Sequence, residues 1–331
     1  MSQRRVSMAM VAERAGVSGQ TVSRVANDSP KVDPATRARV EQAMAELGYR
    51  PNRAARALRT GRSQTLGLVA QTLATVGNSR MLQSVAESAA SRGYALTVVT
   101  LGAEAAIDQA FDRLRDQGVD GAIVLNEATA LARDAASAGL RLVVIDSPPD
   151  DRFTVIGTDH AAGARAATVH LLAAGHRTVH HLAGPVDSFA AAERERGWRE
   201  ALAAAGVAPD EPARGDWGSE SGYRALERML RTVSPTAIFA ANDQMALGAL
   251  RALADSGRRV PEDVAVVGFD DVADAAQYQP PLTTLQQDFD ALGERAVAAL
   301  IARIEQGGDS SASPAAGGVL IEPRLVRRRS A

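Results

Sequence analysis

The stretch MAMVAERAGVSGQTVSRVA (residues 8–26) decides how the chain begins to fold. Its apolar residues recur at helical spacing in two groups, namely Met8, Val11, Ala12 and Ala15, then Val17, Val22 and Val25. Between the groups, Gly16 can adopt a positive φ, Val17 can tuck under the turn, and Ser18 can cap the second helix. The pattern therefore predicts two short helices joined by a tight turn.

The second helix is rich in side chains that form hydrogen bonds. Near its N-terminal end it is expected to expose Gly19, Gln20, Ser23 and Arg24. In a helix-turn-helix this end enters the major groove of DNA. Gln can bond to an adenine edge and Arg to a guanine edge, each for roughly 1–3 kcal/mol of discrimination. We therefore expect Gln20 and Arg24 to read bases, whereas Thr21 and Asn27 suit phosphates better.

Charge is divided unevenly along the chain. Residues 1–62 hold twelve basic and five acidic residues, a net charge of +7, and the remainder holds 25 basic and 34 acidic residues, a net charge of −9. Because attraction to phosphate is local, a basic head on an acidic body is typical of a nucleic-acid-binding module joined to a sensing or assembly domain. Charge alone leaves a solvated basic tail as an alternative.

A third helix is expected from Pro34, capped by Asp33, to Gly48. Its core stripe consists of Val40, Met44 and Leu47. The following segment, YRPNRAARALRTGRS, has an arginine at every third position from Arg50 to Arg62. Because like charges repel and helix nucleation is costly, this segment is at best a marginal helix in water, which DNA could fold.

Two motifs of the head, VAERAGVSGQTVSRV and RPNRAARAL, resemble the DNA-binding domain of the lac repressor (LacI/GalR) family of bacterial transcription factors. The resemblance continues along nearly the whole chain, in HLAGP (181–185), GDW (215–217), PTAIFAANDQMALGALRAL (235–253), VGFDD (267–271) and PPLTTLQQDF (280–289). Collinear motifs of this extent are far more specific than a helix-turn-helix pattern alone.

The resemblance implies that Gln20 and Arg24 are the main base readers, helped by Ser23. It also implies that Leu58 inserts from a hinge helix into the minor groove and kinks the DNA, although Leu58 could be an ordinary linker residue. The sequence departs from the family's namesake at Gly19, where that protein has a large aromatic reader. The expected DNA-contacting residues are Ser18, Gly19, Gln20, Thr21, Ser23, Arg24, Asn27, Asn52, Arg53 and Leu58.

From residue 63 onward, apolar β-rich runs alternate with helical segments, which is typical of parallel sheets covered by helices. The runs are TLGLVA, ALTVVT, GAIVLN, RLVVID, VHHLAG, AIFAAN and VAVVGFD. They are too many for one comfortable sheet, so we expect an α/β body of two subdomains. The resemblance implies a periplasmic-binding-protein-like body with two parallel sheets, three chain crossings and a cleft at the strand ends.

The resemblance also sets the expected boundaries. The helix-turn-helix head would span residues 1–50, the hinge 51–62, and the ligand-binding and dimerisation body 63–327. The N-subdomain would span about 63–158 and 286–312, and the C-subdomain about 159–285 and 319–327.

Polar side chains follow three of the strand runs directly. Asp146, Asn242 and Asp270 stand at carboxyl ends of strands, so all three can point into a crevice and bind sugar hydroxyls. Arg194, expected at the start of a helix, offers a fork of donors. Trp217 offers a flat apolar face to a pyranose.

By resemblance, seven positions contact the effector, namely Asp146, Arg194, Trp217, Asn242, Asp270, Gln287 and Phe289. The spacing R-x-x-G-W selects Arg194 over Arg196 by match to the family. Taken singly, the two aspartates could be strand-end caps, Trp217 and Phe289 could be core residues, and Arg194 could belong to a surface ion pair.

Composition and missing motifs limit other functions. The chain has no cysteine, which excludes disulfides and cysteine metal sites. No run approaches the ~18 apolar residues of a membrane helix and no export signal is evident, so we expect a cytoplasmic protein without a membrane partner. His176, His180 and His181 have no acidic ligand in register, so neither a metal nor a cofactor is expected. Nucleotide-binding glycine motifs are absent.

These features predict a sugar-responsive repressor that binds a near-palindromic operator as a homodimer. Galactosides are the first expectation for the effector. A purine-responsive regulator is the alternative, but QTLATVGNSRM (71–81), expected on the cleft rim, has no aromatic residue to sandwich a base. A solute-binding protein would need an export signal, and a glycosidase would leave the basic head unexplained.

The dimer is also inferred from the resemblance. The family's namesake forms tetramers through a C-terminal helix of leucine heptads. This chain stops at VRRRSA without heptads, so a dimer is expected.

Overall fold

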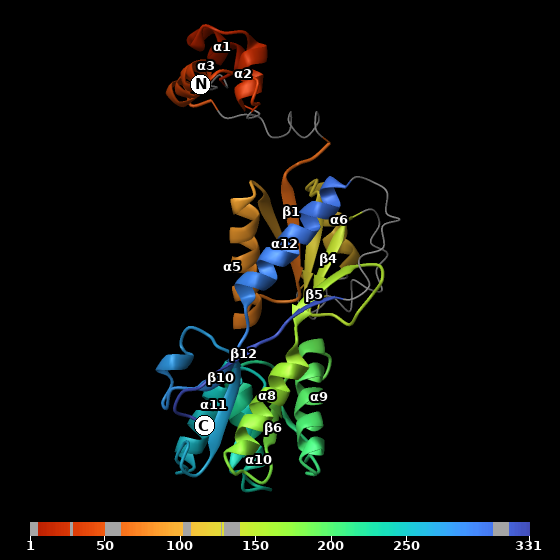
Figure 1. The fold of residues 1–331 in the computed structure, drawn as a ribbon, viewed down its shortest axis with the longest axis vertical. Coiled ribbons are helices and arrows are strands. Elements are labelled where there is room, and N and C mark those ends of the chain that lie inside the picture. The colour runs from red at the N-terminus through yellow and green to blue at the C-terminus, as the bar shows by residue number, and fades with distance from the viewer. Residues whose placement is uncertain are drawn as a thin grey trace. The chain divides into compact units, whose positions relative to one another are not determined.

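A computed structural model describes residues 6–26, 29–49, 61–101, 107–126, 128, 140–306 and 318–331. Its contacts divide the chain into two compact units, residues 1–63 and 64–331. The described part of the first unit is helical, and the second unit has two sheets flanked by helices (Figure 1). Within these ranges, no helix is both long and apolar enough to cross a membrane.

The described residues of the first unit form three helices, namely α1 (Met8–Ala15), α2 (Gly19–Ala26) and α3 (Pro34–Leu47). Gly16 ends α1 in the left-handed conformation, with φ of 65°. At the start of α2, Thr21 N donates to Ser18 Oγ at 3.2 Å. Thr36 N donates to the Asp33 carboxylate at 2.9 Å and so caps α3. The helix-turn-helix prediction is confirmed, including its caps.

A small aliphatic core fixes the helices of this head. Val11, Val22 and Val40, one from each helix, are fully buried. Val17 packs against them from under the turn. Because α2 is held by its apolar face, its opposite face is left to solvent.

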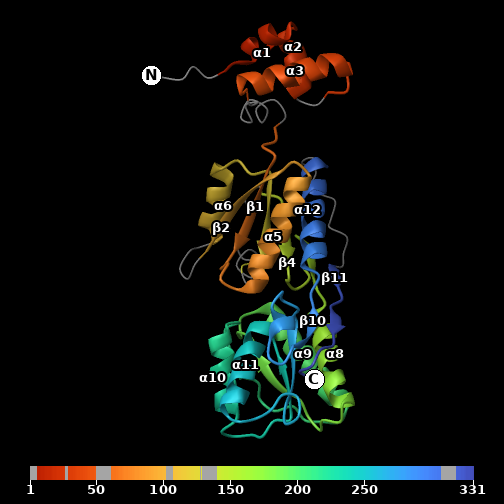
Figure 2. The same ribbon diagram turned by 90° about the vertical axis from the view of Figure 1, so that its left-hand side faces the viewer.

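One half of the second unit, the N-subdomain, contains a six-stranded sheet in the order β11-β5-β4-β3-β1-β2, with every pair parallel. Its elements are β1 (Thr65–Ala70), α5 (Val76–Ser91), β2 (Ala95–Thr100), α6 (Ile107–Asp116), β3 (Gly121–Leu125), β4 (Leu142–Ile145), β5 (Thr154–Thr158), α12 (Phe289–Glu305) and β11 (Val319–Ile321). Helices α5 and α12 pack on one face through Val85 and Leu292, and α6 packs on the other through Phe111 (Figure 2).

The other half, the C-subdomain, contains a second six-stranded sheet in the order β12-β10-β9-β8-β6-β7. Its elements are α8 (His160–Ala173), β6 (His180–Ala183), α9 (Phe189–Ala204), β7 (Ala213–Arg214), α10 (Ser219–Met229), β8 (Ala237–Ala240), α11 (Asp243–Asp255), β9 (Ala265–Asp270), the 3-10 turn η1 (Ala275–Gln277), β10 (Thr283–Gln286) and β12 (Arg324–Val326). Helices α10 and α11 pack on one face through Leu226 and Ala249, and α8 and α9 pack on the other through Ala164 and Trp198.

The chain passes between the two sheets three times, after β5, after β10 and after β11. The assignment of all of 319–327 to the C-subdomain differs from the structure. Strand β11 pairs in parallel with β5, whereas β12 pairs antiparallel with β10. Pro323, which has no N–H to donate, separates the two strands, so one short segment completes an edge of each sheet.

Candidate functional site

Helix α2 presents a polar face to solvent. Val22 and Val25 are buried in the head core. The exposed residues are Ser18, which precedes the helix, Gly19 and Gln20 in its first turn, and Arg24 in its last turn, and Thr21 and Ser23 are half-buried. Because Gln20 and Arg24 are four positions apart on the helix, they lie on the same face. A donor-rich face on the second helix of a helix-turn-helix is the geometry that reads a major groove.

Other predicted DNA contacts cannot be placed in the same way. Asn27, Asn52, Arg53 and Leu58 lie outside the described residues. At Gly19, an added Cβ would meet no atom within 4 Å in the described structure. The first position of α2 is therefore open and carries no side chain.

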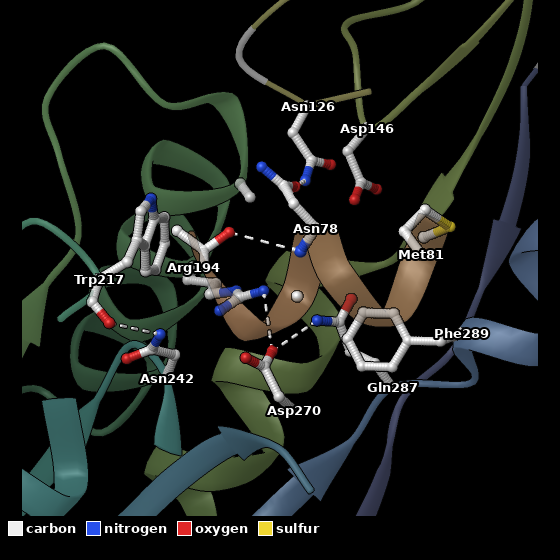
Figure 3. A pocket seen from close by; sticks show the side chains of 13 residues that line it. Asn78, Met81, Asn126, Asp146, Arg194, Trp217, Asn242, Asp270, Gln287 and Phe289 are labelled. Carbon is white, nitrogen blue, oxygen red and sulfur yellow. Dashed lines mark hydrogen bonds and ion pairs between the residues drawn. The ribbon is translucent and has the colours of Figure 1, made fainter. Parts of the chain in front are cut away.

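All seven residues predicted to contact an effector line one pocket in the second unit (Figure 3). The predicted residues are Asp146, Arg194, Trp217, Asn242, Asp270, Gln287 and Phe289; the further lining residues are Thr75, Gly77, Asn78, Met81, Asn126 and Ala190. Both subdomains thus contribute to the pocket.

Sharp backbone turns aim several side chains into this pocket. Asp146 directly follows β4, and Asp270 is the last residue of β9. Among the described non-glycine residues with positive φ, four line the pocket, namely Asn126 (43°), Asp146 (54°), Trp217 (74°) and Asp270 (113°). Left-handed backbone costs non-glycine residues free energy and clusters at binding sites. These left-handed residues redirect the backbone at the ends of the strands, so that the side chains there point into the same pocket.

Arg194 is held by protein groups on several sides. It is the sixth residue of α9, so the prediction that it starts a helix is wrong, because Ser188 caps the helix earlier. Its Nε donates to His160 Nδ1 at 3.3 Å, Nη1 donates to Ala241 O, and Nη2 lies 3.5 Å from Asp270 Oδ1. With 4% of its surface exposed, Arg194 is a buried charge paired at the pocket, and not a member of a surface ion pair.

Asn242 and Trp217 form a second part of the wall. Asn242 Oδ1 accepts from Met245 N at 2.9 Å and so caps α11, while its Nδ2 donates to Trp217 O at 3.1 Å. The amide therefore fixes the loop that carries the indole. Phe289, the first residue of α12, belongs to the N-subdomain core as well as to the pocket.

The two pocket carboxylates have different electrostatic environments. Burial raises the pKa of Asp270, although Arg194 and Gln287 oppose this effect. Burial acts in the same direction on Asp146, but the His160 ring and the Thr158 N–H outweigh it and hold the pKa of Asp146 below its usual value. Asp146 is consequently an acceptor-only group at neutral pH, suited to a hydroxyl donor.

Sequence reasoning did not select several polar residues of this region. Asn78 and Asn126 line the pocket, and Asn126 Nδ2 donates to Asn78 Oδ1. Asn126 directly follows β3, so the strand-end signal that selected Asp146 could have found it. Asn78 lies in the first turn of α5, and Thr158 and His160 lie at a chain crossing, where no comparable local signal exists.

Next to the pocket, Asp243 is fully buried at the start of α11. Thr284 Oγ1 lies 2.6 Å from its Oδ1, and Val272 N donates to its Oδ2 at 2.9 Å. Burial, reinforced by the nearby Asp270 carboxylate, raises the pKa of Asp243 from 3.8 to about 8. At neutral pH the folded protein therefore keeps a proton on this carboxyl that the unfolded chain releases.

We expect the Asp243→Asn variant to unfold at a higher temperature than the parent at about pH 8. Between the unfolded pKa of 3.8 and the folded pKa of about 8, the folded state binds the extra proton, so stability falls as pH rises through this window. The neutral amide removes that dependence. Calorimetric melting from about pH 5 to about pH 8 measures how the Tm of parent and variant depends on pH. Asp255→Asn, on the exposed side of α11, is the control. A parallel decline in Tm for parent and Asp243→Asn would contradict the assignment.

The three neighbouring histidines do not converge on a common point. His176 Nδ1 lies 3.1 Å from Thr236 Oγ1, His180 Nδ1 lies 3.3 Å from Asp210 Oδ2, and His181 Nδ1 lies 2.9 Å from Phe239 O. In the described ranges, no group of three or more histidine, aspartate or glutamate side chains could hold a metal ion.

A solvent-facing recognition helix combined with a polar pocket between two α/β subdomains defines a DNA-binding regulator controlled by a small effector. Comparison with known proteins gives the same class. The family described as "Bacterial regulatory proteins, lacI family" matches residues 7–52, and "Periplasmic binding protein-like domain" matches residues 168–331.

Full-length relatives extend these matches. The lactose operon repressor of Escherichia coli (strain K12) is 38% identical over 331 residues, covering 98% of this chain and 90% of the relative. The HTH-type transcriptional regulator CelR of Thermobifida fusca is 39% identical over 315 residues, covering 91% and 93%. The chain therefore belongs to the LacI family, and it is a transcriptional repressor of that family and not an enzyme.

Solved structures agree with the fold. The lac repressor dimer bound to operator and the anti-inducer ONPF superposes with a TM-score of 0.86 at 36% identity, covering 99% of each chain. The CelR–cellobiose complex superposes with a TM-score of 0.74 at 36% identity, covering 99% of this chain and 100% of that one.

Proposed function

We propose that the protein binds a near-palindromic operator as a homodimer and is released by a small sugar, with galactoside-type sugars as the first expectation. Two α2 helices would enter successive major grooves, and the two hinge segments (51–62) would fold together in the minor groove, where Leu58 would act as an apolar wedge. The effector would favour a closed arrangement of the subdomains that disfavours the folded hinge. Coupling of this kind is typically about 1–3 kcal/mol, or roughly 5- to 150-fold.

The proposed domain boundaries are a head of residues 1–50, a hinge of 51–62 and a body of 63–327. The division of contacts between residues 63 and 64 supports the start of the body. Because operator DNA is the partner, we place the protein in the cytoplasm, with no role for a membrane.

The polar lining of the pocket carries the proposal of a sugar. The pocket is lined by the carboxylates of Asp146 and Asp270 and by the amide of Gln287, and Trp217 adds the face of its indole ring. Sugar hydroxyls both donate and accept hydrogen bonds, while the C–H face of a pyranose packs on an aromatic ring. The relative CelR has been solved with cellobiose, which supports a saccharide for this chain.

A purine remains the second candidate, because two aromatic side chains line the pocket. Trp217 and Phe289 lie on opposite sides of it (Figure 3). The start of α5 and its cap, however, line the pocket with Thr75, Gly77, Asn78 and Met81. None of these residues has an aromatic ring that could stack on a base. The lining as a whole favours hydroxyl recognition.

Two surface features support a dimer. Strand β2 is an edge strand of the N-subdomain sheet, yet its Val98 is 38% exposed and its Leu96 and Val99 are half-buried. On α11, Leu247 is 40% exposed. Apolar residues on an open sheet edge favour coverage by another chain, and the lac repressor structure is a dimer on its operator. A stable tetramer in light scattering at micromolar protein would refute this state.

Calorimetry of the full-length protein against galactosides, cellobiose, other sugars and purines tests the effector class. Operator affinity is then measured at one fixed salt concentration with and without each ligand that binds, since DNA affinity depends steeply on salt. We expect a sugar to bind and to weaken operator binding. Binding of purines alone would reject the proposal of a sugar effector. A sugar that strengthens operator binding would contradict the proposal that sugar releases the protein from its operator.

A further inference from the structure

Six buried side chains at the junction of the two sheets form a closed ring of polar contacts. They are Asp146, Thr158, His160, Arg194, Asp270 and Gln287, each no more than 8% exposed. Four of them line the pocket, whereas Thr158 and His160 stand behind it. The ring joins the N-subdomain strands to the C-subdomain helices.

On the N-subdomain side, the links are short hydrogen bonds. Thr158 N donates to Asp146 Oδ1 at 2.9 Å, and Thr158 Oγ1 donates to Gln287 Oε1 at 2.7 Å. Gln287 lies on the second chain crossing, between β10 and α12. Its Nε2 donates to Asp270 Oδ1 at 2.6 Å (Figure 3), which carries the ring into the C-subdomain.

The ring returns through Arg194 and His160. Arg194 Nη2 lies 3.5 Å from Asp270 Oδ1, and Arg194 Nε donates to His160 Nδ1 at 3.3 Å. His160 Nε2 lies 3.1 Å from Asp146 Oδ1. One imidazole therefore stands between the pocket carboxylate of one subdomain and the pocket guanidinium of the other.

The chemistry of the two neighbours fixes the state of this ring. A guanidinium has donors and no acceptor, so Nδ1 of His160 must be the unprotonated nitrogen. The ring N–H is then on Nε2, which faces the Asp146 carboxylate. His160 therefore accepts a hydrogen bond from Arg194 of the C-subdomain through Nδ1 and presents its N–H to Asp146 of the N-subdomain through Nε2.

The contact between His160 and Asp146 differs from the other links of the ring. In the described structure, His160 Nε2 is buried and has no aligned hydrogen bond, although the Asp146 oxygen is 3.1 Å away. A small movement of either subdomain can align or break this contact, because hydrogen bonds weaken steeply with angle. His160 is also the first residue of α8, directly after the crossing from β5, and therefore stands at the junction of the two subdomains.

We propose that His160 is a positioning residue that holds Asp146 and Arg194 in the arrangement the effector binds, and that it does so without touching the effector. The inference rests on the proposed effector function of the pocket. Changes at His160 should therefore weaken effector binding, whereas operator affinity in the absence of effector should change little.

Three variants of the full-length protein separate the two roles of the imidazole. His160→Asn offers an acceptor near the position of Nδ1 but nothing at Nε2, His160→Gln offers a donor near Nε2 but nothing at Nδ1, and His160→Leu offers neither. His170→Asn, on the same helix and outside the ring, is the matched control. For each variant we would measure affinity for the sugar that binds the parent, operator affinity without sugar, and the unfolding temperature.

We expect His160→Leu to weaken sugar binding on the order of 10- to 100-fold, with smaller losses for the Asn and Gln variants and none for the control. Operator affinity without sugar should stay within about threefold, since α2 is distant in sequence and belongs to another unit. In an Asp146→Asn background, replacement of His160 by Asn should cost much less, because the carboxylate partner of the lost Nε2 contact is already gone.

Unchanged sugar affinity in all three variants would overturn the inference. So would a parallel loss of sugar affinity, operator affinity and unfolding temperature in the Asn and Gln variants, which would make His160 a structural residue. A parent protein that binds no sugar would instead overturn the proposed function, so the two failures are distinguishable.

Discussion

The Asp270→Asn variant is expected to bind its operator normally and to lose the response to sugar. Asp270 accepts from Gln287 and pairs with Arg194 inside the pocket, and a neutral amide gives up the charge that strengthens a hydrogen bond from a sugar hydroxyl. Loss of one such bond to a charged group costs about 1.5–3 kcal/mol, or roughly 10- to 150-fold in affinity. Calorimetry gives the sugar affinity, and operator release by sugar gives the response.

The neighbouring Asp271→Asn variant is the control for this experiment. Asp271 accepts from Gln286 and Arg328 and does not line the pocket, so the same chemical change is made one residue away. We expect it to retain the sugar response. If Asp270→Asn also lost operator affinity in the absence of sugar, Asp270 would be a structural residue and the pocket assignment would fail.

Replacement of Arg24 by Ala is expected to lower affinity for the cognate operator by about 1–3 kcal/mol, or roughly 5- to 150-fold, and to relax the base preference at one position. Arg24 is exposed on α2 beside Gln20, where it can donate two hydrogen bonds to a guanine edge. Gln20→Ala should act similarly at a different base. Fluorescence anisotropy at one salt concentration, on cognate and single-substituted operators, measures both effects.

Arg39→Ala removes the same charge from α3 and is the matched control. Arg39 is exposed and its Nη2 donates to Thr36 Oγ1 at 3.4 Å. We expect it to weaken binding slightly and equally on every duplex, because only the general attraction to phosphate changes. Equal weakening of all duplexes by Arg24→Ala would rule out base readout by this residue.

The head was predictable because its signals are local. Gly16 takes the left-handed conformation that the turn requires, and Ser18 and Asp33 cap the helices that follow them. Each of these features depends on residues within a few positions of one another. The seven strand runs of the body were found for a related reason, since a buried parallel strand must be apolar along its length.

Two of the strands that escaped prediction lack such runs. Strand β7 has two residues, and β10 reads TTLQ, with two buried threonines. The division of 319–327 between both sheets depends on free strand edges that exist only after the sheets have formed. Local sequence cannot indicate pairing of that kind.

By itself, the sequence determined the helix-turn-helix, the alternating α/β body and the carboxylates at the strand ends, because short-range periodicity, caps and apolar runs encode them. Only the tertiary structure decided that Thr158 and His160 stand behind the pocket and link Asp146 to Arg194 and Gln287. These contacts join residues far apart in the chain, and their strength comes from burial between two subdomains, which no local pattern records.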